Sequence, residues 1–476
     1  MIKYSYLYTI FLVLFISCVK DKQAKKEDNR STKQKPPNVI VVVVDDAGYL
    51  DFGFMGSKDL DTPHIDQLAK DGVYFTDAHV SATVCAPSRA GLITGKYQQR
   101  FGFEANHTGD KHTGDIGLSD DATTLADVFK ENNYNTVAIG KWHLGETKTD
   151  QPKQRGFKDF YGFLSGGRSY FPIKNPPATH ALQHNGKRVI FDGYLTDVLG
   201  DYAVDYVQKN KDNPFFMYLA YNAVHTPMHA KEEDLIKYKD HPRKELAAMT
   251  WSLDQNIGKL HNKLKELDLL DNTLIYFISD NGGAHNNSSN NGELKGWKGN
   301  KFEGGHRVPF IVSWPAKIEK NQKFTGLTSS LDIFTTSIAA ADIKVSEDLS
   351  LDGVNLLPYL MNEKSGNPHK KLYWRKLEEA AARHGDYKLI RLKNHGSVLY
   401  NLSKDIGEMN NLADSDTLTL NNLSKGLSTW ESKLIDPLWK EDKDWMNITY
   451  HIHKKLMENK PVLYMSPNGV KNHLNK

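Results

Sequence analysis

The stretch Val84–Gly95 combines residue types that could form a reactive centre. Cys85, Pro87 and Arg89 stand at alternate positions, and the small residues that follow favour a helix. A cysteine at a helix start and close to an arginine has its thiolate stabilised by the helix dipole and the guanidinium. The same residues also suit Cys85 as a small buried apolar side chain. The stretch alone leaves a nucleophile and a core residue as alternatives.

Acidic side chains follow two segments that read as buried strands. Asp45 and Asp46 directly follow one continuous apolar run, and Asp280 and Asn281 follow a second. The first pair by itself also fits a turn that caps the next segment. Ligands of open α/β sheets collect at the carboxyl ends of strands, and oxygen ligands suit calcium or magnesium, whereas zinc favours Cys and His. The repeated pattern therefore predicts a calcium or magnesium site.

Basic side chains lie in three further polar segments. Lys141 and His143 belong to Gly-Lys-Trp-His-Leu-Gly at the end of a predicted strand, and His225 follows another buried run. Lys298 lies in a glycine-rich loop. Lone lysines and histidines in such places are ordinarily solvated or hydrogen-bonded, so their type alone assigns them no role.

Taken together, these motifs resemble those of the type I sulfatases, in the alkaline phosphatase-like superfamily. Cys-x-Pro-x-Arg followed by Leu-x-Thr-Gly resembles the signature in which a dedicated maturation enzyme oxidises the cysteine to formylglycine. The segments 140–145, 225–227 and 295–309 resemble further motifs of the family, in the expected order. The resemblance extends from Asn38 to about Leu434 and implies hydrolysis of sulfate esters.

The resemblance also implies roles for the matching residues. One hydroxyl of hydrated formylglycine attacks sulfur, and deprotonation of the second expels sulfate, which avoids the stable ester that a serine or cysteine would leave. Arg89 and Lys141 would hold the hydrate, and His143 would help to deprotonate it. His225 would protonate the leaving oxygen, and Lys298 would bind sulfate. The ligands of a calcium ion, with magnesium less favoured, would be Asp45, Asp46, Cys85 as formylglycine, Asp280 and Asn281.

Three side chains in loops are predicted to bind substrate. Arg168 lies in the long stretch 162–193, and loops of this length are often functional, although a loop arginine is more often only solvated. Arg168 would bind a carboxylate or a second sulfate. His229 follows the His225 motif. His306 stands where many relatives carry a small apolar residue, so we predict that it selects the substrate.

The N-terminus predicts export. Lys3 precedes the apolar run 6–16, which is too short for a comfortable membrane span. Residues 14–18 resemble a bacterial lipobox, with Phe15 departing from the preferred leucine. We therefore predict a lipoprotein signal peptide over 1–17 and lipidation of Cys18, with an ordinary secretory signal as the alternative. A polar, flexible tether over residues 18–37 would follow.

The net charge and the cysteine content limit which partners and which cellular compartment are expected. The net charge of +3 over 476 residues is too small and dispersed to favour nucleic acid. Lipidation of Cys18 and oxidation of Cys85 would leave no thiol, which suits an oxidising compartment, and a disulfide between the two cysteines is the alternative. We expect a protein in the bacterial periplasm or at the outer membrane or cell surface, with membrane contact only through its lipid anchor.

The length of 476 residues predicts one large domain with a smaller one attached. The resemblance implies an α/β fold in which a mixed sheet sandwiched by helices occupies residues 38–366, and a smaller α+β domain with an antiparallel sheet occupies residues 367–476. In the smaller domain, strands are expected at 371–375, 380–391 and 398–402 under a helix at 418–434. The aromatic and basic tail from Asp436 has no assigned role.

The predicted function is a sulfatase that acts on a sulfated polysaccharide or oligosaccharide. The substrate would be algal, such as ulvan or carrageenan, or a glycosaminoglycan. One alternative is a formylglycine-dependent phosphodiesterase or phosphonate hydrolase. The other is an inactive surface lipoprotein that binds sulfated glycans, in which Cys85 is never oxidised.

Overall fold

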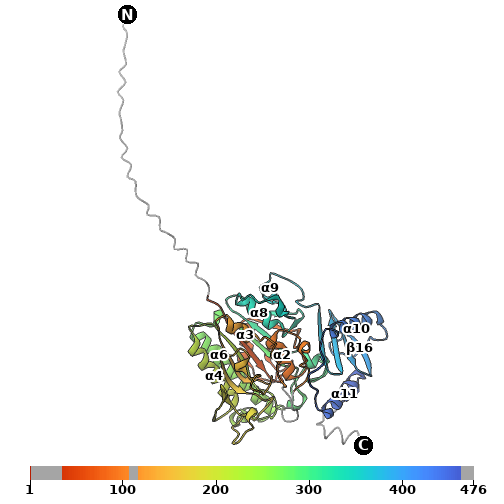
Figure 1. Ribbon diagram of the computed structural model, residues 1–476, viewed down its shortest axis with the longest axis horizontal. Helices are drawn as coiled ribbons and strands as arrows, with labels where there is room; N and C mark the ends of the chain where they lie inside the picture. The colour runs from red at the N-terminus through yellow and green to blue at the C-terminus, as the bar shows by residue number, and fades with distance from the viewer. Residues whose placement is uncertain (2–34, 107–115, 463–476) are drawn as a thin grey trace. The chain divides into compact units, whose positions relative to one another are not determined.

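The computed structural model describes Met1, residues 35–106 and residues 116–462 (Figure 1). Residues from Pro36 onward belong to one compact unit, Pro36–Lys476. The predicted signal peptide, Cys18 and most of the predicted tether lie outside the described residues. Among the described residues, no helix is both long and apolar enough to cross a membrane.

The larger sheet is mixed, with a parallel centre. In order across the described sheet, its strands are β11 (Gln322–Phe324), β2 (Val73–Phe75), β10 (Phe310–Ser313), β9 (Thr273–Ser279), β1 (Asn38–Val44), β8 (Phe215–Ala220), β4 (Asn135–Lys141), β5 (Asp159–Phe163), β6 (Gln183–His184) and β7 (Lys187–Arg188). Strands β9, β1, β8, β4 and β5 are parallel, whereas β10 is antiparallel to β9. Val43 pairs with Ala220 and with Ile278, so the residues after β1, β8 and β9 meet at one edge.

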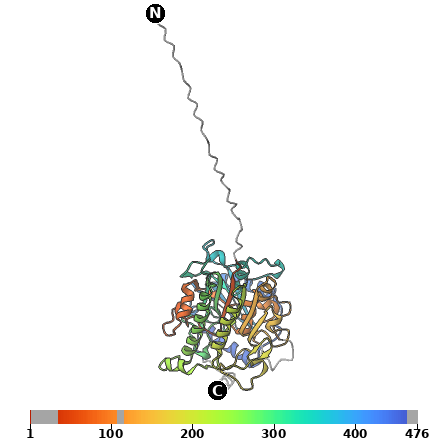
Figure 2. The same ribbon diagram turned by 90° about the vertical axis from the view of Figure 1, so that its left-hand side faces the viewer.

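Helices cover both faces of this sheet (Figures 1 and 2). Alternate residues of β1 belong to two apolar clusters, because successive side chains of a strand point to opposite faces. The helices of one face are α1 (Pro63–Lys70), α4 (Leu195–Asn210) and α6 (Lys244–Glu266). Those of the other are α2 (Cys85–Thr94), α3 (Leu125–Glu131), α8 (Asp332–Ala340) and α9 (Leu357–Leu360). The predicted sheet between helices is confirmed.

Short elements connect these layers. Strands β3 (Ala78–His79) and β12 (Thr328–Ser329) form a two-stranded parallel pair. Helices α5 (Glu232–Lys237) and α7 (Glu303–His306) lie in the loops after β8 and β9.

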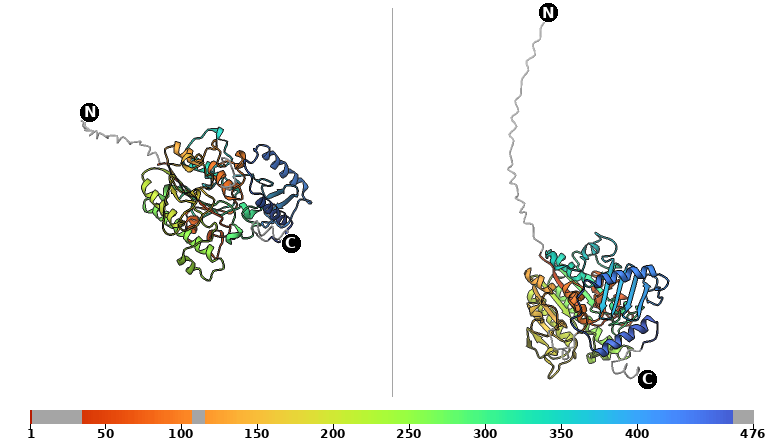
Figure 3. Two further views of the ribbon diagram at one scale, coloured as in Figure 1. Left: turned by 60° about the horizontal axis from the view of Figure 1, so that its bottom comes forward. Right: turned by 45° about the vertical axis from the view of Figure 1, so that its right-hand side comes forward.

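The smaller sheet is a four-stranded antiparallel meander (Figure 3). The prediction of one strand over 380–391 is wrong, because Gly385 adopts a left-handed conformation, with φ 58°, and turns the chain. The strands are β13 (Lys371–Lys376), β14 (Glu379–His384), β15 (Tyr387–Leu392) and β16 (Gly396–Asn401).

Two helices pack on this smaller sheet through separate apolar clusters. Helix α10 (Thr417–Glu431), which the sequence predicts, covers one face with Leu423 and Leu427. Helix α11 (Lys443–Met457) packs on the other face with Ile448 and Ile452, together with Phe302 from the loop before α7. The tail with no predicted role therefore forms a helix at the junction of the two sheets.

Candidate active site

The acidic residues after β1 and β9 meet at the carboxyl edge of the larger sheet. Asp46 has a φ of 63°, in the left-handed region. Its backbone N–H donates to Asp280 Oδ1 at 3.3 Å, and Asn281 Nδ2 donates to Asp46 Oδ1 at 2.8 Å. Together with Asp45, all of these side chains are buried. The register of the parallel strands thus brings together two pairs that lie more than 230 residues apart in the sequence.

This cluster has the donor set of a site for a hard cation. The Asn281 Oδ1 atom is buried and has no hydrogen-bond partner within the described residues. Ligand atoms of Asp45, Asp46, Cys85 and His225 all lie within 4.8 Å of one another. Buried carboxylates together with an unsatisfied amide oxygen suit calcium or magnesium.

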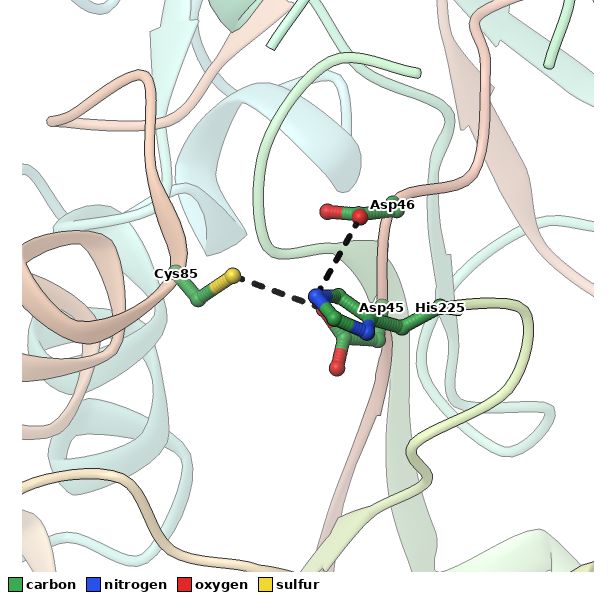
Figure 4. A group of neighbouring side chains, drawn as sticks. All are labelled: Asp45, Asp46, Cys85 and His225. Carbon is green, nitrogen blue, oxygen red and sulfur yellow. Dashed lines mark hydrogen bonds and ion pairs between the residues drawn. The ribbon is translucent and has the colours of Figure 1, made fainter. Parts of the chain in front are cut away.

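Cys85 is the first residue of α2 and faces this cluster (Figure 4). Its Sγ lies 3.0 Å from Lys298 Nζ and 3.6 Å from Asp45 Oδ1. Burial raises the pKa of the thiol to about 12, and the nearby Lys141 and Lys298 offset this effect only in part. This differs from the expectation of a stabilised thiolate, because Arg89 pairs with Asp280 instead. At neutral pH Cys85 is a free, protonated thiol and a poor nucleophile.

Two buried cations neutralise the carboxylates from the side of β4 and α2. Lys141 Nζ lies 2.6 Å from Asp45 Oδ2, and Arg89 Nε donates to Asp280 Oδ2 at 2.8 Å. Burial raises the pKa of Asp45, but Lys141, His225 and Arg89 outweigh it and hold that pKa well below its usual range. Burial and the charge of Asp45 raise the pKa of Asp280 to about 6.

Lys298 rather than Lys301 reaches this cluster, as the sequence motif predicts. Its Nζ lies 2.6 Å from Asp46 Oδ1, and the side chain lines the cavity in front of Cys85. Lys301 is buried elsewhere and donates to Thr83 Oγ1 at 3.1 Å. The two lysines of one loop thus have different environments.

The two predicted catalytic histidines occupy different positions. His225 lines the cavity, and its Nδ1 donates to the Thr226 carbonyl at 2.6 Å, which leaves Nε2 3.7 Å from Asp46 Oδ2. Burial and Lys298 lower the pKa of His225, so the imidazole is neutral at pH 7. His143 is buried at the end of β4 with its ring against Gly166, where a Cβ would lie 2.5 Å from Nε2. Only glycine leaves room for this ring.

A cavity of about 310 Å³ opens in front of these groups. Asp46, His225 and Lys298 line it on the side of the larger sheet. Glu441 and Trp445 line it from α11 and the segment before that helix. This contribution of the tail was not predicted from the sequence. The only signals for it were the aromatic content of the tail and the helical spacing of Trp445, Ile448 and Ile452.

The side chains predicted to bind substrate are not among the described residues that line this cavity. Arg168 is 5% exposed, with its guanidinium over the rings of Phe163 and Phe191. Its Nε donates to the Ser169 carbonyl at 3.1 Å. His229 is exposed, with Nδ1 3.3 Å from Ser169 Oγ.

His306 is placed where substrate contact is excluded. Its side chain is fully buried, with Nδ1 2.9 Å from His79 Nδ1 and Nε2 3.0 Å from Lys388 Nζ. The ring stacks on Trp374 with centroids 4.0 Å apart. The structure therefore corrects the prediction of a substrate-selecting residue, because His306 packs between the two sheets.

The fold and the cluster at its edge are those of a sulfuric ester hydrolase. Residues 37–343 match the sequence model of the sulfatases, and residues 295–433 match that of the C-terminal part of N-sulphoglucosamine sulphohydrolase. The chain belongs to the sulfatase family, with its alkaline phosphatase-like fold.

Relatives of known name support this membership. The chain is 34% identical over 400 residues to the uncharacterised sulfatase YdeN of Escherichia coli K12, with 72% of this chain and 69% of YdeN covered. It is 30% identical to human N-acetylgalactosamine-6-sulfatase, with 69% and 66% covered. The crystal structure of Ps i-CgsB in complex with k-i-k-neocarrahexaose has a TM-score of 0.81 and 38% identity, with 88% of this chain and 98% of that chain covered.

Proposed function

We propose that this chain hydrolyses sulfate esters of a sulfated polysaccharide or its oligosaccharides, with carrageenan as the leading substrate. The observation that carries this proposal is the 38% identity, over nearly the whole of its length, to a structure that holds a neocarrahexaose. A glycosaminoglycan is the second candidate, favoured by the similarity to N-acetylgalactosamine-6-sulfatase.

We further propose that Cys85 is converted to formylglycine by a maturation enzyme. The signature around Cys85 and the high pKa of its thiol support this step, because the unmodified side chain is a poor nucleophile. Formylglycine would supply one hydroxyl to attack sulfur and a second whose deprotonation releases sulfate. Lys298 lies within 3.0 Å of the reacting position, so its ammonium can bind an oxygen of the sulfate there.

The proposed metal is calcium, held by Asp45, Asp46, Asp280, Asn281 and the modified side chain at position 85. The bound ion would neutralise charge on the sulfate oxygens. His225 lines the same cavity and would donate a proton from Nε2 to the leaving sugar oxygen. A negatively charged sulfate nearby would favour the protonated form of this imidazole.

The test of the nucleophile is mass spectrometry of the tryptic peptide Asp71–Arg89 from protein made in its native host. We expect a peptide lighter than the thiol form, since aldehyde oxygen replaces sulfur. An unmodified thiol in a host with active maturation would contradict the mechanism and favour the sulfated-glycan-binding lipoprotein.

The test of the reaction is a substrate panel with and without metal. Wild-type enzyme should hydrolyse 4-methylumbelliferyl sulfate faster than an aryl phosphodiester, and carrageenan oligosaccharides faster than glycosaminoglycan oligosaccharides. Chelation should abolish turnover, and calcium should restore it better than magnesium. Faster turnover of the phosphodiester would favour the phosphodiesterase alternative, and full activity after chelation would contradict the metal site.

We also propose that Cys18 is lipidated and that this lipid anchors the mature protein in the bacterial periplasm or at the outer membrane or cell surface. The lipobox-like residues 14–18 and the polar stretch that follows support this localisation. Cys18→Ala should move the protein from the membrane fraction to the soluble fraction of the host. An unchanged distribution would contradict the lipid anchor.

A further inference from the structure

The ring of His225, the proposed general acid, is oriented by the main chain that carries it. Its Nδ1 donates to the Thr226 carbonyl at 2.6 Å, and its Nε2 lies 3.7 Å from Asp46 Oδ2 (Figure 4). The segment 222–225, which follows β8, belongs to no helix or strand. Contacts with other parts of the chain must therefore fix the course of this segment.

Asn287 links this segment to the acidic cluster. It ends the 3₁₀ helix η7 (His285–Asn287) in the loop after β9 and is only 1% exposed. Its Nδ2 donates to the Val224 carbonyl at 3.0 Å and to the Asp46 carbonyl at 3.1 Å. Its Oδ1 accepts from the Ser289 N–H at 3.0 Å, which fixes the orientation of the amide, because a backbone N–H only donates. One amide from the loop after β9 thus bridges the chain that follows β1 and the chain that follows β8.

Tyr170 binds two further carbonyls of the same segment. Its fully buried hydroxyl donates to the Asn222 carbonyl at 2.5 Å and to the His225 carbonyl at 2.8 Å. Burial raises the pKa of Tyr170 well above its usual value, so the hydroxyl keeps the proton that it donates.

Every carbonyl of segment 222–225 therefore accepts from outside the segment. Tyr170 and Asn287 bind three of these carbonyls, and the fourth, that of Ala223, accepts from the Asp45 N–H at 2.9 Å. A shift of the segment would leave buried carbonyls without their donors, which is costly. The histidine ring is thus held in place before a substrate binds.

A general acid acts only when it lies within hydrogen-bond reach of the oxygen that it protonates. We propose that Asn287 and Tyr170 are positioning residues that hold His225 Nε2 at the leaving oxygen of the sulfate ester. Asn287 also keeps the acid in register with Asp46, because the same amide binds both segments. The inference rests on the proposed function, in which His225 protonates the leaving oxygen.

The test uses two aryl sulfates that need the acid to different degrees. 4-Nitrophenyl sulfate releases a stable phenolate that needs little protonation, whereas phenyl sulfate releases a more basic oxygen. The readout is the ratio of kcat/KM on phenyl sulfate to kcat/KM on 4-nitrophenyl sulfate. His225→Ala should lower this ratio most, Asn287→Leu about tenfold and Tyr170→Phe about threefold.

A double-mutant cycle separates positioning from a general structural role. Because Asn287 and Tyr170 act through His225, their effects on the ratio should disappear when this histidine is absent. In the His225→Ala background, adding Asn287→Leu or Tyr170→Phe should change the ratio by less than about twofold. A further fall as large as that seen with His225 present would overturn the positioning role.

Two other buried side chains offer matched controls. Asn291 lies in the same loop as Asn287, and its Nδ2 donates to the Gly283 and Gly296 carbonyls, each at 3.2 Å. The hydroxyl of Tyr134 donates to the Pro37 carbonyl at 3.1 Å. Asn291→Leu and Tyr134→Phe should lower the free energy of unfolding but leave the ratio of the two sulfates at the wild-type value.

The outcomes distinguish this inference from the proposed function. A variant of Asn287 or Tyr170 that keeps the wild-type ratio, or that loses activity equally on both sulfates, removes its residue from the positioning role. If Asn287→Leu does not fold, Tyr170→Phe, which removes a single hydroxyl, decides the question. An unchanged ratio in His225→Ala would contradict the general acid and, with it, this inference. Wild type that hydrolyses neither aryl sulfate would contradict the proposed function as a whole.

Discussion

Among the described residues, two buried clusters contain the residue types that ligate metals, but only one of them adjoins both an unsatisfied ligand atom and a cavity. Asp45, Asp46, Cys85 and His225 form the first, and His79, Glu303 and His306 form the second. In the second, both nitrogens of each imidazole and both oxygens of Glu303 have protein partners. In the first, the adjoining Asn281 Oδ1 has no hydrogen-bond partner in the described part of the chain, and the cluster borders a cavity.

The difference shows that proximity of ligating residues does not define a site. Lys388 Nζ lies 2.9 Å from Glu303 Oε1 and 2.9 Å from Glu408 Oε1, so a fixed cation from β15 already neutralises the second cluster. That cluster joins the two sheets of the molecule. The first cluster instead combines an amide oxygen that has no hydrogen-bond partner among the described residues with an opening to a cavity, which are the conditions for an exchangeable ligand.

The largest effect is expected when the proposed nucleophile of the first cluster is removed. Cys85→Ala should lower kcat on 4-methylumbelliferyl sulfate by about 10⁴-fold or more, because the side chain that forms the covalent bond is absent. The thermal unfolding midpoint should change little, since alanine keeps the Cβ and loses only the terminal group of a small side chain. Turnover within about 100-fold of wild type would contradict the role of Cys85.

A substitution in the second cluster should lower the stability of the folded protein. Lys388→Met leaves the carboxylates of Glu303 and Glu408 buried without their common cation, so the free energy of unfolding should fall by about 3–5 kcal/mol in urea titrations. The double variant Lys388→Met/Glu408→Gln should recover part of this loss, because one of the uncompensated charges is removed. Wild-type stability in Lys388→Met would show that the second cluster does not hold the sheets together.

Two lysines of one loop provide a matched pair for the sulfate-binding role. Lys298→Ala should raise the activation barrier by about 2–4 kcal/mol, since a preorganised charge beside the reacting group is lost. Lys301→Met, which changes a buried lysine outside the cavity lining, should affect kcat far less. Steady-state kinetics on an aryl sulfate measure both. If Lys301→Met lowers kcat more than Lys298→Ala does, the assignment of sulfate binding to Lys298 is wrong.

The smallest effect concerns His453, which joins α11 to the larger domain outside both clusters. Burial and the nearby Lys301 lower the pKa of His453 to about 3, so it protonates more readily in the unfolded chain. Its stabilising contribution is present above pH 6.5 and is lost as pH falls towards 3. Between pH 7 and pH 5, protonation of this histidine in the unfolded chain should lower the free energy of unfolding by about 2 kcal/mol. In urea titrations, the unfolding free energy of His453→Gln should change by that amount less than the wild-type value between pH 7 and pH 5. If the two pH profiles are identical, His453 does not contribute to the pH dependence of stability.

Local patterns were sufficient for the larger sheet and for most of the first cluster. The β-branched runs before Asp45 and Asp280 predict parallel strands, because a strand buried on both faces needs apolar residues at every position. The parallel register then brings the residues after these strands to one edge. The break at Gly385 was missed because apolar residues stand on both sides of the turn, although the Gly385-Asp386 pair is itself a turn signal.

The sequence by itself determined the family, the order of the motifs and the choice of Lys298 over Lys301, because each depends on short-range spacing. Only the tertiary structure decided that His306 lies in the interface between the sheets and that Trp445 lines the cavity. Burial and access depend on which distant segments pack together, and here α11 and β15 return to residues more than 80 positions earlier in the chain.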